Sequence, residues 1–122
     1  MRPEERNSDP IKSDIERERF VRAAFLAEQM GLPEEEIRHL RYQALGQMAV
    51  VYRNALGTKG LALQYGFSRQ AVSKVLEEFA DKMKKEGNTK PLDPCYDYRT
   101  GRYLSLEEWV EHYLKVWDKL SA

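Results

Sequence analysis

The chain has 122 residues, of which 20 are Lys or Arg and 20 are Asp or Glu, so its formal net charge is zero. Apolar residues make up 42% and charged residues 33%, which excludes a disordered or collagen-like chain and indicates a folded, soluble protein. The length suits one domain with one continuous core, because globular domains span roughly 100–200 residues.

The sequence also predicts where the protein resides. Cys95 is the single cysteine, so no disulfide can form within the chain and a reducing environment is expected. The first residues are charged and include no apolar segment typical of a signal peptide. No apolar run approaches the ~18 residues that a membrane span requires. We therefore expect a cytoplasmic protein without a membrane partner.

The N-terminal part is predicted to be an arm followed by a helix. Residues 1–12 are polar and show no periodicity, so we expect a flexible arm that leads into a single helical domain over 13–122. Ser13 and Glu16 have the spacing of a capping box, which predicts the start of a helix. Gly31 suits the left-handed conformation that follows a last helical turn, and we expect the helix to end there.

A second, longer helix is predicted after Pro33. Proline suits a first helical position, and the three glutamates that follow it complement the positive end of the helix dipole. Apolar residues recur at steps of three and four as far as about residue 54. Leu45, Val50 and Tyr52 fall off that stripe, so this helix is expected to be covered on more than one side.

After Gly57, which interrupts the pattern, two shorter helices are predicted over 58–65 and from 68 to about 85. A loop over 89–97 and a small hairpin over 96–104 follow, with Gly101 at the turn.

The last helix is predicted to begin at a second capping box and to run to Leu120. Ser105 and Glu108 form that capping box.

The segment over 58–76 carries the strongest functional pattern. Ala62 is small enough for two helices to approach closely, and Gly66 can adopt the backbone of a tight turn between them. Val72 and Val75 place the inner face of the second helix against the first. Ser68 is a natural N-cap for the second helix. Leu61, Tyr65 and Phe67 are expected to fill the space between the two helices.

This segment resembles the helix-turn-helix of bacterial and phage DNA-binding proteins. The small, turn and core residues fall at the spacing of that motif, and the resemblance covers only these ~20 residues. It implies a helix-turn-helix over 58–86 whose second helix lies in the DNA major groove. The implied base contacts are Arg69, Gln70, Ser73 and Lys74, since Arg or Lys can bond guanine and Gln can bond adenine. The implied backbone contacts are Thr58, Lys59, Ser68, Lys82, Lys84 and Lys85.

The zero net charge conceals a segregated distribution. Residues 1–46 carry eight basic and ten acidic side chains, residues 47–90 eight and four, and residues 91–122 four and six. The only basic third therefore holds the motif, which favours one DNA-facing surface. Glu77 is the exception on the outward face, because a carboxylate there accepts a bond from cytosine or repels phosphate.

Catalytic, metal and cofactor sites are not expected. His39, His112 and Cys95 have no metal-ligand spacing, and no phosphate loop or nucleophile motif is present. Tyr96, Tyr98 and Tyr103 could stack on bases, but such tyrosines are more often cross-strand pairs that hold a hairpin against the core. A third possibility is that the hairpin acts as a wing against the minor groove.

The last helix predicts a partner surface. Its apolar residues nearly encircle it, so one side is expected to face its own domain and the other a second copy, although simply sealing the monomer core is an equal alternative. The expected dimer interface consists of Trp109, Tyr113, Val116, Trp117 and Leu120.

The fold prediction is thus an all-α protein of about five helices, with a central helix-turn-helix and a small β-hairpin before the C-terminal helix. The predicted function is non-catalytic, sequence-specific binding of double-stranded DNA by a transcriptional regulator that acts as a homodimer. Two alternatives stay open: DNA recognition in a phage or plasmid packaging or replication process, and a helical protein-interaction module that does not bind DNA. The sequence does not identify a small-molecule effector.

Overall fold

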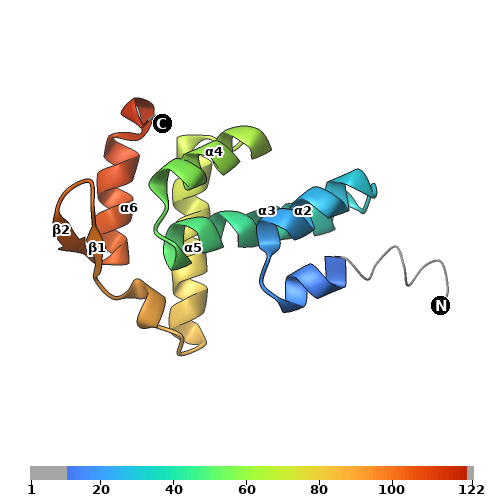
Figure 1. Ribbon diagram of the computed structural model, residues 1–122, viewed down its shortest axis with the longest axis horizontal. Helices are drawn as coiled ribbons and strands as arrows, with labels where there is room; N and C mark the ends of the chain where they lie inside the picture. Colours follow the sequence, from blue (N-terminus) through green and yellow to red (C-terminus); the bar gives the residue numbers. More distant parts are fainter. Residues whose placement is uncertain (1–10, 121–122) are drawn as a thin grey trace. The chain divides into compact units, whose positions relative to one another are not determined.

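The computed structural model of the chain describes residues 11–120 (Figure 1). Those residues are mostly helical, with one two-stranded hairpin before the last helix, as the sequence predicts. Contacts divide the chain into two compact units, Met1–Ala44 and Leu45–Ala122, where one continuous domain was expected. The predicted arm lies outside the described residues except for residues 11 and 12, which are already helical.

The first unit contains a helical segment over 11–16, α2 (Phe20–Gln29) and most of α3 (Glu34–Gly46). The single helix predicted from Ser13 to Gly31 is wrong, because Glu18 has a φ of 56° and divides it in two. Ser13 therefore lies inside a helix and is not its cap. The core of this unit consists of Ile11, Ala23, Ala24, Ala27, Ile37 and Leu40, with Phe20, Leu26 and Leu32 packed against it.

In the second unit the long helix ends in a wider turn. After Gly46 the chain forms a π-helical turn, η1 (Gln47–Val51), in which the amide of Tyr52 donates to the carbonyl of Gln47 over 3.1 Å. Of the three residues that fall off the apolar stripe, Leu45 and Val50 are buried as predicted, whereas Tyr52 is 62% exposed. Arg53 follows in a left-handed conformation, with a φ of 50°.

The remaining helices are α4 (Ala55–Tyr65), α5 (Arg69–Lys85) and α6 (Leu106–Lys115). α4 begins three residues earlier than predicted, because the side chain of Asn54 accepts a hydrogen bond from the amide of Gly57 and caps it. α6 ends five residues before Leu120 and is followed by a 3₁₀ turn, η3 (Trp117–Lys119). The capping box of Ser105 and Glu108 is present as predicted.

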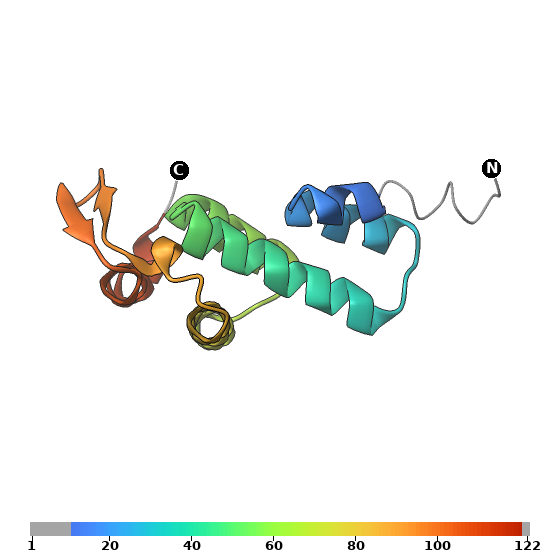
Figure 2. The ribbon, with the colours of Figure 1, turned by 90° about the horizontal axis from the view of Figure 1, so that it is seen from below.

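A short hairpin connects α5 to α6. It pairs β1 (Cys95–Asp97) with β2 (Arg102–Leu104) in antiparallel register, and it follows a 3₁₀ turn, η2 (Lys90–Leu92). Gly101 occupies its turn with a φ of 70°, as the sequence predicts. Figures 1 and 2 agree that α5 and α6 lie side by side and that α6 lies between α5 and the hairpin.

The guanidinium of Arg53 holds this unit together. Its Nη1 donates to the carbonyl of Leu104 over 3.0 Å, and its Nη2 donates to the carbonyls of Pro91 over 3.0 Å and Asp93 over 2.9 Å. One side chain thus joins the end of the π-helical turn to the loop before the hairpin and to the second strand. Desolvation by burial lowers the pKa of this guanidinium from its usual value.

We expect Arg53→Ala to lower the free energy of unfolding by about 2–4 kcal/mol, because hydrogen bonds from charged groups contribute about 1.5–3 kcal/mol each and are not additive. Arg53→Gly should lose about 1 kcal/mol less, since glycine adopts the positive φ without strain. Urea denaturation followed by the fluorescence of Trp109 and Trp117, which both belong to this unit, measures the change. The control is Arg102→Ala, an exposed hairpin arginine. Equal stability of Arg53→Ala and this control would contradict the role of Arg53.

Gly46 permits the close approach of α5. A Cβ atom at this buried position would overlap the ring of Phe79, whereas a Cβ at Gly60 would meet no atom within 4 Å. We therefore expect Gly46→Ala to destabilise the protein by about 1–3 kcal/mol. Gly60→Ala, also within a helix, should stabilise it by about 0.5–1 kcal/mol. Thermal unfolding of the two variants measures both effects, and a stabilising Gly46→Ala would show that Phe79 can move aside.

Candidate functional site

The turn between α4 and α5 has the local geometry that the sequence predicts. Gly66 adopts a φ of 77°, and the amide of Phe67 donates to the carbonyl of Ala62 over 2.8 Å to close the end of α4. The hydroxyl of Ser68 accepts a hydrogen bond from the amide of Ala71 over 3.1 Å and caps α5. Only three residues separate the two helices, so the direction of α5 is fixed by the end of α4.

The apolar residues predicted to lie between the two helices are buried or half-buried. Ala62 and Val72 are fully buried, and Val75 and Leu61 are 6% and 7% exposed. Tyr65 and Phe67 are half-buried and pack edge to face, with ring centroids 6.1 Å apart. The residues assigned to the contact between the helices are therefore fully or partly withdrawn from solvent. α5 itself packs against α6 and η1.

The predicted base-contact residues lie on the first two turns of α5. Arg69, Gln70 and Lys74 are exposed, whereas Ser73 is half-buried. Three of the four side chains are thus accessible to a partner. Lys82, Lys84 and Lys85 are exposed at the other end of the helix, ~20 Å away at ~1.5 Å per residue.

Two predicted phosphate contacts are corrected or reassigned by the structure. Thr58 is 1% exposed and its hydroxyl donates to the carbonyl of Asn54, so this side chain is closed to phosphate and the prediction is wrong. The Nζ of Lys59 donates to the carbonyls of Trp117 over 2.7 Å and Leu120 over 2.8 Å. Lys59 therefore caps the C-terminal end of the chain's last turns, which is where a cation is favourable.

A groove of about 590 Å³ lies between α5 and α6 and borders the predicted recognition face. Its apolar lining includes Leu76, Leu106, Val110 and Leu114. Four carboxylates and one lysine also line it, namely Glu77, Asp81, Glu107, Glu111 and Lys84. Ser73 lines the same groove, so one edge of the recognition face meets an acidic surface. Phosphate contact on that edge is disfavoured.

The predicted dimer interface is wrong for four of its five residues. Trp109, Tyr113, Trp117 and Leu120 are each at most 8% exposed and belong to the core of their own chain. Val116 is half-buried. The apolar residues on the last helix are therefore used within the monomer: one side packs on the hairpin and η2, and the other on α5.

The hairpin tyrosines form an exposed cluster. Tyr96 and Tyr103 are cross-strand partners with ring centroids 5.3 Å apart, and Tyr98 packs edge to face on Tyr96 at 5.0 Å. The cross-strand pair is as predicted, but Tyr103 is 70% and Tyr98 91% exposed, so these rings do not press against the core. Because α6 separates the hairpin from α5, the arrangement does not favour a wing beside the recognition helix (Figure 2).

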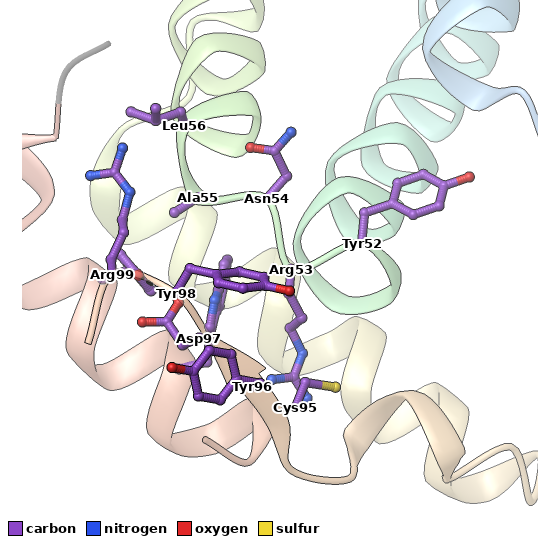
Figure 3. A pocket seen from close by; sticks show the side chains of 12 residues that line it. Tyr52, Arg53, Asn54, Ala55, Leu56, Cys95, Tyr96, Asp97, Tyr98 and Arg99 are labelled. Carbon is purple, nitrogen blue, oxygen red and sulfur yellow. Dashed lines mark hydrogen bonds between the residues drawn. The ribbon is translucent and has the colours of Figure 1, made fainter. Parts of the chain in front are cut away.

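A pocket of about 400 Å³ lies beside this cluster and was not predicted (Figure 3). Asp97 is at its edge, where Oδ1 accepts a bond from the hydroxyl of Tyr113 over 2.7 Å and Oδ2 from the amide of Thr100 over 2.9 Å. Burial raises the pKa of the Asp97 carboxyl, but these hydrogen bonds outweigh it and the pKa lies below its usual value. Burial, together with the bond to Asp97 and its charge, raises the pKa of Tyr113 to about 12.

Sequence reasoning missed Arg53 and the pair formed by Asp97 and Tyr113. Arg53 stands between a helix and Asn54 with no motif around it, and its partners lie at least 38 residues away. Between residues 11 and 120, no group of three or more His, Cys, Asp or Glu side chains is arranged to hold a metal ion. No helix in that range has the length and apolar character needed to cross a bilayer.

The pair of Asp97 and Tyr113 predicts a pH dependence. Because the pKa of Tyr113 is raised in the folded state, its contribution to stability is present below the unfolded pKa of about 10 and is lost as the pH rises through about 12. Ultraviolet titration of phenolate formation should show one tyrosine that ionises last. Asp97→Asn should lower that final pKa toward 10, about its ordinary value, and Tyr113→Phe should remove the step. Tyr98→Phe, at an exposed ring, is the control and should leave it; a final step unchanged by Asp97→Asn would contradict the assignment.

Comparisons with family models, with curated proteins and with solved structures find no match to this chain, so its function is argued from its own residues.

Proposed function

We propose that this chain binds double-stranded DNA in a sequence-specific manner through α4 and α5, and that it acts as a transcriptional regulator. The observation that carries the proposal is the first part of α5. Arg69, Gln70 and Lys74 are exposed there on a helix that follows α4 after a short capped turn and whose inner valines are buried. A rigid helix that presents Arg, Gln and Lys has the chemistry for reading base edges in the major groove.

The distribution of charged side chains supports a small area of contact with DNA. The segment over 47–90 has an excess of four basic side chains, and it contains both helices. The acidic groove along one side of α5 restricts phosphate contact to the other side and to the helix ends. Such a distribution gives modest affinity for DNA of random sequence, so base contacts must supply a larger share of the binding energy.

The proposed regulator does not depend on a dimer through α6. The residues assigned to that interface are in the core, so a homodimer would have to use another surface. A role in phage or plasmid packaging or replication would use the same helices and the same base contacts. A protein-interaction module is the second candidate, and the apolar groove with its four carboxylates favours it, because that surface suits a basic partner.

We expect duplex binding whose affinity falls steeply as salt rises, because protein cations release counterions from DNA. Selection from a random duplex library followed by fluorescence anisotropy at several salt concentrations measures both the preferred site and this dependence. The wild-type chain should prefer the selected site over a scrambled duplex. Absence of duplex binding at low salt, or binding that does not respond to salt, would favour the interaction module.

Single substitutions on α5 distinguish contacts with DNA bases from non-specific electrostatic contacts with phosphate. On the selected site, Arg69→Ala or Lys74→Ala should each cost about 1–3 kcal/mol and reduce the discrimination against the scrambled duplex. Glu77→Gln should have the opposite sign and strengthen binding to both duplexes, because it removes a carboxylate from the edge of the interface. Arg102→Ala is the control, since α6 lies between the hairpin and α5. Equal losses on both duplexes for Arg69→Ala and Lys74→Ala would assign these residues to phosphate contacts.

A further inference from the structure

The pocket beside the hairpin is built by three separate segments of the second unit. Residues 52–56 come from the segment after the π-helical turn and from the first turn of α4. Residues 95–99 come from β1 and the hairpin turn, and Trp109 and Tyr113 come from α6 (Figure 3). Its volume of about 400 Å³ is within the range of sites for small molecules. None of its residues belongs to α5, which carries the proposed base contacts, and the pocket includes only the first turn of α4.

The lining of this pocket is rich in aromatic rings. Tyr96 and Tyr98 stand at its edge with 46% and 91% of their surface exposed, and Trp109 and Tyr113 are almost fully buried behind them. The rings of Trp109 and Tyr113 are in contact, with centroids 5.0 Å apart. Tyr52 also lines the pocket, but Figure 3 shows its ring directed away from the hairpin. Exposed rings beside buried ones favour a flat aromatic ligand that stacks against them.

Hydrogen-bond donors outnumber available acceptors among these residues. Both carboxylate oxygens of Asp97 already accept bonds, from Tyr113 and Thr100. In contrast, the indole Nε1 of Trp109 is buried without an acceptor in the described chain, and so is the Nε of Arg53. Trp109 is only 3% exposed, and Nε1 itself has almost no exposed surface. Its resonance therefore reports on what binds beside the indole.

Two cations and one carboxylate are among the residues that line the pocket. Arg53 and Arg99 both line it, and Figure 3 shows the side chain of Arg99 extended toward Leu56 in the first turn of α4. That turn is the N-terminus of an 11-residue helix, whose dipole favours an anion. Asp97 is the one acidic residue in the lining, and its charge is already stabilised by hydrogen bonds.

We propose that this pocket binds a small planar aromatic anion. Its ring packs against Tyr96 and Tyr98 beside the indole of Trp109, and its anionic group lies near Arg99 and the first turn of α4. The anion could be a carboxylate or a phosphate monoester, and both share this chemistry. The proposal does not rest on DNA binding and can be tested without DNA.

The experiment follows the indole N–H resonances of isotope-labelled protein by NMR while naphthoate or adenosine monophosphate is added. Trp109→Phe assigns the resonance of Trp109, and Trp117, which does not line the pocket, provides an internal reference. We expect saturable shifts of the Trp109 resonance with at least one of the two anions, and the tighter one identifies the anionic group. Neutral naphthamide should bind about tenfold more weakly, and cationic naphthylmethylamine should not bind, because a lost charge-assisted hydrogen bond is a loss of about tenfold or more.

Variants test the assigned contacts. Arg99→Gln should weaken anion binding about tenfold, the effect of losing one charge-assisted contact, while the matched Arg102→Gln on the same hairpin should leave it unchanged. Tyr98→Ala should weaken all aromatic probes and needs no change in the core. If Trp109→Phe fails to fold, Trp117→Phe identifies the indole resonance of Trp117. The remaining indole resonance then belongs to Trp109. Equal binding of the amine and the anions, a Trp109 resonance that does not move, or Arg99→Gln equal to Arg102→Gln would each overturn the proposal.

Discussion

The second unit depends on one guanidinium. Arg53 follows a π-helical turn, has a positive φ and donates to three carbonyls that lie 38 to 51 residues further along the chain. Those carbonyls belong to the loop before the hairpin and to its second strand, so the bonds fix where the hairpin starts and where α6 begins. A wider helical turn and a left-handed non-glycine residue both have an unfavourable conformational free energy, and they persist where surrounding contacts stabilise them. Here the three hydrogen bonds of Arg53 supply that stabilisation.

A second cation fixes the opposite end of the same frame. Lys59, one turn into α4, donates to the carbonyls of Trp117 and Leu120, so α4 is linked to the chain's last turns. Both ends of the segment over 53–59 are thus anchored to the C-terminal part of the fold. α5 then leaves α4 after a three-residue turn with Gly66 in a left-handed conformation. The exposed side chains at the start of α5 therefore follow a segment that is anchored at both ends.

Local signals in the sequence predicted local structure well. The capping box of Ser105 and Glu108, the left-handed Gly66 and Gly101, and the buried Ala62 and Val72 each follow from neighbouring residues. Thr58 and the aromatic residues of α6 were assigned to partners because an outward and an inward position cannot be distinguished without knowing what packs on the other side. α6 is enclosed by α5 on one side and by the hairpin and η2 on the other, and those contacts join segments distant in sequence. Arg53 and Lys59 were missed or misassigned for the same reason: their acceptors are backbone carbonyls, which leave no trace in the sequence pattern.

The distribution of charge separates three surfaces within one unit. The start of α5 presents cations, the groove between α5 and α6 is mostly acidic, and the pocket beside the hairpin combines arginines with the positive end of α4. Opposite charges on adjoining surfaces reduce non-specific attachment to a polyanion, because its phosphates cannot lie along the whole of α5. Zero net charge is therefore compatible with anion binding at two places, provided that each is small and bounded. An anion bound in the pocket would contact the first turn of α4, and the other end of α4 leads into α5. α4 is therefore shared by the pocket and the proposed DNA interface.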